Sequence, residues 1–311
     1  APDVSPTERV ELHVELGGVL ADQLARTGDA IRAYRAALAD EPEHIEAFKA
    51  LAELYRATGQ TEALLDADEA QVDATDRATR LARYPELAEA WRSRGRGDRA
   101  AACWRKLVAI DPQSAIALRG VAGALAAAGD LDGALAAYRQ ALAIEPDHAG
   151  ALDELARGYE RSGEAAAALG VLERLVDRVQ ERAPRAELFR RLGAAHFDVD
   201  DVPTARADFL QALELDPENA AAHEGLARVH LKQDKIASGG DELVRAGELA
   251  ADQADKVRCF TDAAWVFRHR LRDQERARQC LLLVLELEPE HADAKLALAQ
   301  LLQDTQQWES L

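Results

Sequence analysis

Three histidines have a spacing that could serve chemistry. His223 and His230 lie seven residues apart, which places them on one face of a helix, and His196 belongs to a preceding segment of similar pattern. Imidazoles of this kind can hold a metal ion. However, no carboxylate is spaced to complete a ligand set, and related segments carry Leu or Tyr at these places. We therefore interpret the three as core residues that replace aromatics, and we predict no metal site and no cofactor.

The other polar residues point away from catalysis. Cys103, Cys259 and Cys280 form no CxxC pair, which disfavours a zinc site or a disulfide framework and leaves three structural thiols. The chain contains no G-x-S-x-G, H-E-x-x-H or Walker-type motif. Acidic residues occur throughout, so a chosen pair of them carries no information about acid–base catalysis. We predict that the chain is not an enzyme.

The formal net charge of −18 limits the partners. A chain this acidic repels phosphate backbones and anionic membrane surfaces, so we expect no nucleic-acid partner. The apolar stretches are shorter than the ~20 residues that a membrane span requires. Proteins or peptides remain as the expected partners.

The helices that must position these residues follow a repeat. Similar segments end at five prolines, and the steps between them are 70, 34, 71 and 72 residues. These steps correspond to one or two repeats of about 34–36 residues. The prolines are Pro42, Pro112, Pro146, Pro217 and Pro289.

The unit at residues 115–148 shows the physics of one repeat. Apolar residues recur at helical spacing in two blocks that Gly129 and Asp130 separate. Gly129 can adopt the positive φ that ends a helix, and Asp130 can cap the next helix. Pro146 lacks an N–H group and stops the second helix. A lone hairpin cannot bury its apolar face, whereas stacked hairpins share one core.

This unit resembles the tetratricopeptide repeat. The matching residues are Leu118, Val121, Ala122, Leu125, Gly129, Asp130, Ala134, Tyr138, Ala141 and Pro146. The resemblance implies an all-α, right-handed α-solenoid of about 8.5 helix–turn–helix repeats in a single domain, residues 1–311. The expected repeats are residues 10–44, 45–80, 81–114, 115–148, 149–185, 186–219, 220–256, 257–291 and a partial one at 292–311.

Three departures from the pattern carry structural predictions. Repeats one and eight hold an extra residue before the second helix. Pro85 falls where first-helix residues belong, so we predict a short helix that begins at Pro85. Gly239 and Gly240 replace Ala in the seventh repeat, which indicates either close helix packing or a soft joint.

Composition also suggests a source and a context. Arg greatly outnumbers Lys, which favours a bacterial protein, and the lack of Met suggests that the natural N-terminus is missing. The sequence stops where the second helix of the ninth repeat should begin, so we expect a fragment of a longer array that continues past Leu311. The odd number of cysteines, with no disulfide framework, favours a cytoplasmic location, and a periplasmic location stays open.

The resemblance implies that the first helix of each repeat lines a concave groove. At the corresponding places we predict a protein-binding site made of Arg119, Asp153, Arg157, Arg190, Phe197, Glu224, Arg228 and Leu231. Arginines beside apolar residues fit a peptide with acidic residues and an apolar anchor. The alternative is that Asp153, Glu187 and Glu224 pair with these arginines inside the molecule. The Lys/Asn/Arg clamp of chaperone-binding members is absent.

The predicted function is a non-catalytic scaffold for protein–protein interaction. One alternative is a regulatory, substrate-recruiting arm of an enzyme whose catalytic domain lies outside this chain. Another is an architectural array that assembles end to end through Trp308. The sequence leaves the oligomeric state open.

Overall fold

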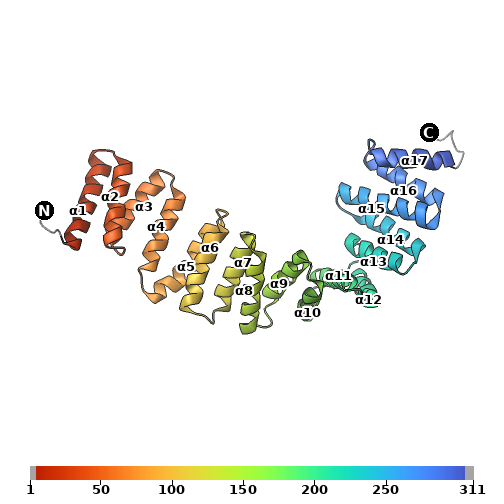
Figure 1. Cartoon of the computed structure of the whole chain (residues 1–311), viewed down its shortest axis with the longest axis horizontal. Helices are drawn as coiled ribbons and strands as arrows, with labels where there is room; N and C mark the ends of the chain where they lie inside the picture. The colour runs from red at the N-terminus through yellow and green to blue at the C-terminus, as the bar shows by residue number, and fades with distance from the viewer. Residues whose placement is uncertain (1–4, 305–311) are drawn as a thin grey trace. The chain divides into compact units, whose positions relative to one another are not determined.

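The computed structural model describes residues 5–304, which form α-helices and two short π-helices and contain no strand (Figure 1). Gln307 and Trp308, on which end-to-end assembly would rest, lie outside these residues. The helices are α1 Pro6–Gly18, η1 Val19–Gln23, α2 Thr27–Asp40, α3 Ile45–Ala57, α4 Thr61–Asp73, α5 Arg77–Arg92, α6 Gly97–Ile110, α7 Ala115–Ala127, α8 Leu131–Ile144, α9 Ala149–Ser162, α10 Ala165–Val176, α11 Arg182–Asp198, α12 Val202–Leu215, α13 Ala220–Lys232, α14 Ile236–Leu249, α15 Gln253–Trp265, η2 Val266–Leu271, α16 Gln274–Leu287 and α17 Ala292–Asp304.

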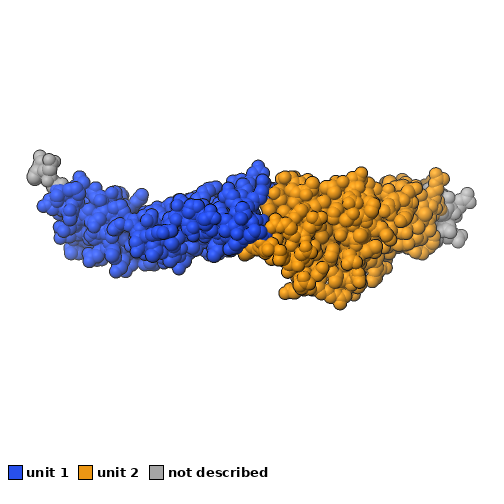
Figure 2. Space-filling model, turned by 90° about the horizontal axis from the view of Figure 1, so that it is seen from below, with its two compact units in different colours: residues 1–146 blue, residues 147–311 orange. Residues whose placement is uncertain are grey.

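The chain divides into two compact units, residues 1–146 and 147–311 (Figure 2). Within each unit, consecutive helices pair as hairpins with a first and a second helix, and neighbouring hairpins stack (Figure 1). This arrangement confirms the predicted all-α solenoid. Among the described residues, no helix combines the length and the apolar character needed to cross a bilayer.

Each hairpin turns through one residue with positive φ. Four turns use glycine, and four use residues for which this conformation is strained. Gly129, with φ of 85°, ends α7, and the Asp130 side chain then accepts a hydrogen bond of 3.0 Å from the backbone N–H of Gly133, as predicted. The eight residues are Ala25, Gly59, Gly95, Gly129, Gly163, Asp200, Asp234 and Arg272.

The extra residue in the first and eighth hairpins is absorbed by π-helical turns. η1 continues α1, and η2 continues α15. A π-helix fits one more residue into a turn than an α-helix does, so the inserted residue widens the helix without shifting the turn that follows.

The five prolines confirm their predicted role as helix stops, because each second helix ends two residues before its proline. The residue two places after the proline caps the next helix. His148, for example, accepts the backbone N–H of Ala151 through Nδ1 at 3.1 Å. His44, Ser114, Asn219 and His291 occupy the same place and make the same bond.

In three hairpins no proline precedes the first helix. In these hairpins a side chain connects the start of the first helix to the end of the second. Here the first residue of the first helix donates to the last carbonyl of the second helix, which would otherwise lack a partner. We name this contact the clasp. The three clasps are Arg77 to Ile110 at 3.4 Å, Arg182 to Leu215 at 2.6 Å and Gln253 to Leu287 at 2.8 Å.

The prediction that a short helix begins at Pro85 is wrong. Helix α5 begins at Arg77 and runs through Pro85. Asp76 caps the helix by accepting the backbone N–H of Thr79 at 2.7 Å, and buried Tyr84 donates its hydroxyl to Asp73 at 2.5 Å. An internal proline costs about 3 kcal/mol. The cap, the hydroxyl bond and the burial of Tyr84 together offset a cost of that size.

The glycine pair in α14 serves close packing. Gly239 and Gly240 are both buried, and a Cβ atom at either would overlap a neighbour: Leu231 for Gly239 and the Phe267 ring for Gly240. Of the two alternatives for this pair, the structure supports close packing rather than a soft joint.

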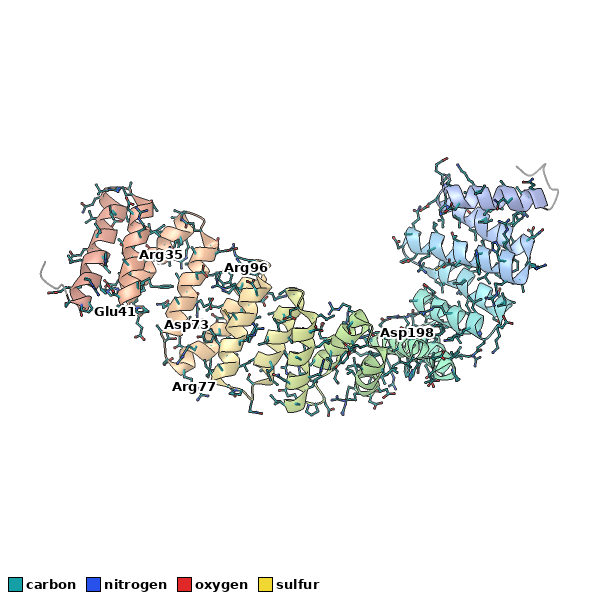
Figure 3. All side chains as sticks on the ribbon, viewed as in Figure 1. Arg35, Glu41, Asp73, Arg77, Arg96 and Asp198 are labelled. Carbon is teal, nitrogen blue, oxygen red and sulfur yellow. The ribbon has the colours of Figure 1, made fainter. Side chains whose placement is uncertain are left out.

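Helix α4 is held to α6 by charge rather than by apolar packing. Only Glu69 and Val72 are buried in α4. Its acidic side chains follow one face and meet cations of α6 and the turn before it. The pairs are Glu62–Arg96 at 3.0 Å, Asp66–Arg99, Glu69–Arg99 at 3.0 Å, Glu69–Lys106 at 2.8 Å and Asp73–Lys106 at 2.5 Å. Figure 3 labels Asp73, at the end of α4, and Arg96, in the turn before α6.

Replacing a strained turn residue with glycine should stabilise the protein. Arg272 has φ of 60°, a conformation that costs a non-glycine residue about 1 kcal/mol. We expect Arg272→Gly to raise the free energy of unfolding by about 0.5–1 kcal/mol, and the matched change Gly129→Ala to lower it by a similar amount. Urea denaturation measures both. If both changes raise, or both lower, the free energy of unfolding, the positive φ does not determine the stability of these turns.

The contact between α4 and α6 should weaken in acid. Burial disfavours the Glu69 carboxylate, but hydrogen bonds from Lys106 and Arg99 outweigh burial and hold the pKa of Glu69 below its ordinary value of 4.5. The resulting stability is complete above that value and is lost as pH falls through the lower folded-state pKa. Glu69→Gln should therefore reduce the free energy of unfolding at about pH 7, and this difference should shrink at about pH 3. Urea denaturation of both proteins at each pH tests this, and a difference that does not change with pH would contradict it.

Candidate functional site

The predicted site residues lie on first helices, and seven of the eight belong to the second unit. Asp153 and Arg157 are on α9, Arg190 and Phe197 on α11, and Glu224, Arg228 and Leu231 on α13. We call the surface formed by α9, α11 and α13 the first-helix face. Arg119 is on α7 in the first unit, where it pairs with Glu145.

Each predicted arginine of the first-helix face has a carboxylate partner. The Arg157 Nε lies 3.0 Å from Asp153 one turn away, and Arg190 makes a two-nitrogen contact with Glu187 at 2.5 and 2.8 Å. Arg228 contacts Asp198, labelled in Figure 3, at 3.5 Å. These pairs are at least partly exposed, and such pairs contribute only about 0–1 kcal/mol each. Glu224 binds none of these arginines and instead pairs with Arg258 at 2.7 Å.

A residue that the sequence did not single out, Arg191, connects the helices of this face. Its side chain is only 6% exposed, with Nη1 at 2.5 Å from Asp153 and Nε at 2.7 Å from Glu160. Burial opposes its charge, but the hydrogen bonds to Glu160 and Asp153 outweigh burial and keep the pKa of Arg191 above its ordinary value. Arg191 therefore ties α11 to α9 through a buried cation, and adjacent Arg190 remains at the surface.

Two pockets flank Arg191. One has a volume of about 360 Å³ and is formed by α9, α10, α11 and the segment between α10 and α11. Its polar groups include Asp153, Arg157 and Glu187. Its apolar side chains include Leu175, Val179, Pro184 and Leu188. The other, of about 290 Å³, contains Arg190, Ala194 and Asp198. Arg191 lines both pockets, so it forms the wall between them.

Phe197 and Leu231, the two apolar residues of the predicted site, are both partly covered. The Phe197 ring lies beneath two cations, with Arg228 at 4.4 Å and Lys232 at 4.8 Å from its centroid. Such contacts are favourable cation–π interactions. Leu231 is partly buried and packs towards Gly239. Leu175, Val179 and Leu188 line a pocket instead, and the repeat pattern alone gave no signal for them.

Two of the three candidate histidines bond to a carboxylate within their own hairpins. His196 Nδ1 lies 2.7 Å from Asp208, and His223 Nδ1 lies 2.6 Å from Glu242. Burial raises the pKa of Asp208, although its bond to His196 opposes this shift. The Nδ1 atom of His230 is buried without a hydrogen-bond partner. Within residues 5–304, no group of three His, Cys, Asp or Glu side chains is placed to hold a metal ion.

The three cysteines are buried free thiols, as a structural role requires. Burial raises the pKa of Cys103 to about 12 and those of Cys259 and Cys280 to about 11. At neutral pH these groups are protonated and are poor nucleophiles.

Sequence comparisons identify the repeat. Two family models described as tetratricopeptide repeat match the chain, one at residues 86–149 and 190–255 and the other at residues 125–191. Together they cover residues 86–255, more than half of the chain. The chain belongs to the tetratricopeptide repeat family. Members of this family are generally non-catalytic scaffolds for protein interaction that bind peptides or proteins.

Solved structures agree on the fold. The C-terminal part of a TPR repeat-containing protein from Cytophaga hutchinsonii aligns with a TM-score of 0.54 at 14% identity, over 92% of this chain and 99% of that chain. Pseudomonas aeruginosa pilF aligns with a TM-score of 0.51 at 19% identity, over 72% of this chain and 99% of that one. At these identities the likeness concerns the fold alone.

One curated relative shares a short segment. The heat shock protein STI1 of Saccharomyces cerevisiae is 49% identical over 45 residues, which are 14% of this chain and 8% of that protein. The match has the length of little more than one repeat, so it indicates a shared repeat.

Two neighbouring arginines should differ sharply in their structural roles. Arg191→Leu leaves Asp153 and Glu160 without their shared buried cation, and we expect it to lower the free energy of unfolding by about 2 kcal/mol. The matched change Arg190→Leu removes a partly exposed pair and should cost no more than about 0.5 kcal/mol. Urea denaturation compares the two, and equal losses would show that Arg191 does not join α9 to α11.

Proposed function

We propose that this protein is a scaffold that binds a partner peptide on the first-helix face of its second unit. The peptide carries acidic residues and an apolar anchor. The observation that carries this proposal is the pair of adjoining pockets on either side of Arg191, where predicted residues Arg157 and Arg190 lie beside apolar walls.

The arginines of this face can exchange their internal carboxylate partners for the carboxylates of a ligand. The Arg157–Asp153 and Arg190–Glu187 pairs connect residues of the same helix, so neither is needed to hold two helices together. Because each pair contributes about 0–1 kcal/mol, a ligand carboxylate can replace the internal one at little cost. Arginine offers the ligand two parallel N–H donors, which strengthens the contact.

The apolar wall supplies the remaining affinity. Leu175, Val179, Pro184 and Leu188 surround a space of about 360 Å³, which is at the small end for a ligand pocket and suits one side chain. Burying an apolar side chain there contributes about 1.5–3 kcal/mol. Buried Arg191 fixes the spacing of α9 and α11 and thereby preforms the pocket.

Selection from a random peptide library displayed on phage tests the proposal. We expect bound peptides to be enriched in Asp and Glu around a Leu or Phe. The double variant Arg157→Glu with Arg190→Glu should bind a selected peptide at least about tenfold more weakly, a loss of about 1.4 kcal/mol. Added salt should weaken wild-type binding, because the arginines are at least partly exposed.

Arg245→Glu is the matched control. Arg245 forms a similar exposed pair with Glu248 within one helix, but on the second helix α14. It should bind the selected peptide as the wild type does. If the double variant keeps its melting temperature and also keeps full affinity, the first-helix face is not the binding site.

A further inference from the structure

The first unit contains a pocket of about 300 Å³ that is independent of the first-helix face. It lies between the second helices α2 and α4, with α3 as its floor. Its lining residues are Arg35, Leu38, Ala39, Pro42, Phe48, Leu51, Tyr55, Ala63, Asp66, Ala67, Ala70 and Gln71. We call it the α2–α4 pocket.

The pocket exists because α4 departs from the packing rule of the other second helices. Counted from the turn residue of positive φ, the fifth residue is small and buried in every described hairpin except this one, where it is Leu64. The small residues are Ala30, Ala100, Ala134, Ala168, Ala205, Gly239 and Ala277. A leucine needs more room between the two helices than the alanine or glycine that the other hairpins place there.

The ninth residue after the turn differs as well. In the other hairpins it is a large apolar or aromatic side chain that fills the space beside the first helix. These residues are Tyr34, Trp104, Tyr138, Leu172, Phe209, Leu243 and Leu281. In α4 the ninth residue is Asp68, which turns away and binds Arg83 at 2.9 Å. At this position α4 therefore supplies no large apolar side chain.

The charge pairs between α4 and α6 fix this opening. Besides Asp66 and Gln71, the residues that α4 contributes to the pocket lining are alanines: Ala63, Ala67 and Ala70. Phe48, Leu51 and Tyr55 of α3 provide the opposite wall. Most of the lining is thus apolar, with Arg35, Asp66 and Gln71 as its polar groups.

The charge at the pocket is set by Arg35. Asp66 already has a partner in Arg99. Arg35 is exposed on α2 (labelled in Figure 3), and among residues 5–304 no hydrogen bond or ion pair engages its guanidinium. The charged group at this pocket that is available to a ligand is therefore the Arg35 guanidinium, a cation in a chain of net charge −18.

We propose that the α2–α4 pocket is a second binding site, which takes a large apolar side chain of a partner peptide, with an acidic residue next to it pairing with Arg35. A buried leucine or phenylalanine side chain supplies the apolar contact, and the planar guanidinium can bind a carboxylate through two donors. Gln71, at the same pocket, adds an amide that can bond to a peptide backbone.

The probes are fluorescein-labelled peptides of about twelve residues, a length that spans one pocket and its flanks. The test peptide has a central Phe with Glu on either side. One control peptide replaces Phe with Ser, and another replaces Glu with Lys. Fluorescence anisotropy should detect binding of the Phe–Glu peptide and at least about tenfold weaker binding of both controls.

Two variants locate the site. Ala67→Phe fills the pocket and should reduce affinity for the Phe–Glu peptide at least about tenfold without lowering the melting temperature. Arg35→Glu, an exposed change that leaves the core intact, should reverse the preference between the Glu-flanked and Lys-flanked peptides. Arg105→Glu is the matched control, because Arg105 occupies the same place on α6, one residue after Trp104. It should bind as the wild type does.

Two further measurements distinguish the α2–α4 pocket from the first-helix face and from self-association. The double variant Arg157→Glu with Arg190→Glu should leave binding of the Phe–Glu peptide unchanged; if that variant alone abolishes binding, the peptide occupies the first-helix face and the proposal fails. It also fails if the Phe–Glu peptide binds no better than the Ser control, or if both Ala67→Phe and Arg35→Glu bind normally. Sedimentation velocity checks for a second copy of this chain: a wild-type dimer that Ala67→Phe converts to a monomer would assign the pocket to self-association instead.

Discussion

The close approach of the two helices in each hairpin is the constraint on which the structure depends. A turn residue in the left-handed conformation reverses the chain, and a small residue five positions later lets the second helix approach the first. The large residue at the ninth position then enters the gap between helices. Where these conditions hold, the two helices of a hairpin pack closely against each other. Where they fail, in α4, charged pairs hold the helix and a pocket remains.

Much of the fold could be predicted because its determinants are local. The turn at Gly129, the cap at Asp130 and the stop at Pro146 each act within a few residues, so the sequence pattern locates them directly. The π-helical turns likewise follow from a surplus residue in two hairpins. Pro85 was misjudged because its local preference competes with contacts made by Asp76 and Tyr84, one of which connects two helices.

The candidate site was harder to predict because it depends on long side chains that choose among several partners. Helical spacing placed Arg190 on the first-helix face, but it could not indicate that adjacent Arg191 is the buried one. That outcome depends on carboxylates of α9 that lie more than 30 residues away in sequence. Spacing also could not show that Arg228 covers the Phe197 ring. The α2–α4 pocket results from what α4 lacks, and this becomes visible only when its turn is aligned with the other turns.

The clasps at Arg77, Arg182 and Gln253 affect how easily an array of this kind can gain or lose hairpins. A hairpin with a clasp satisfies the last carbonyl of its second helix from within, and it does not need the following hairpin for that purpose. Since stability in a solenoid is a sum of hairpin and nearest-neighbour terms, a segment closed in this way can be duplicated, deleted or joined to a new neighbour with little loss at the junction. The clasped hairpins are α5–α6, α11–α12 and α15–α16.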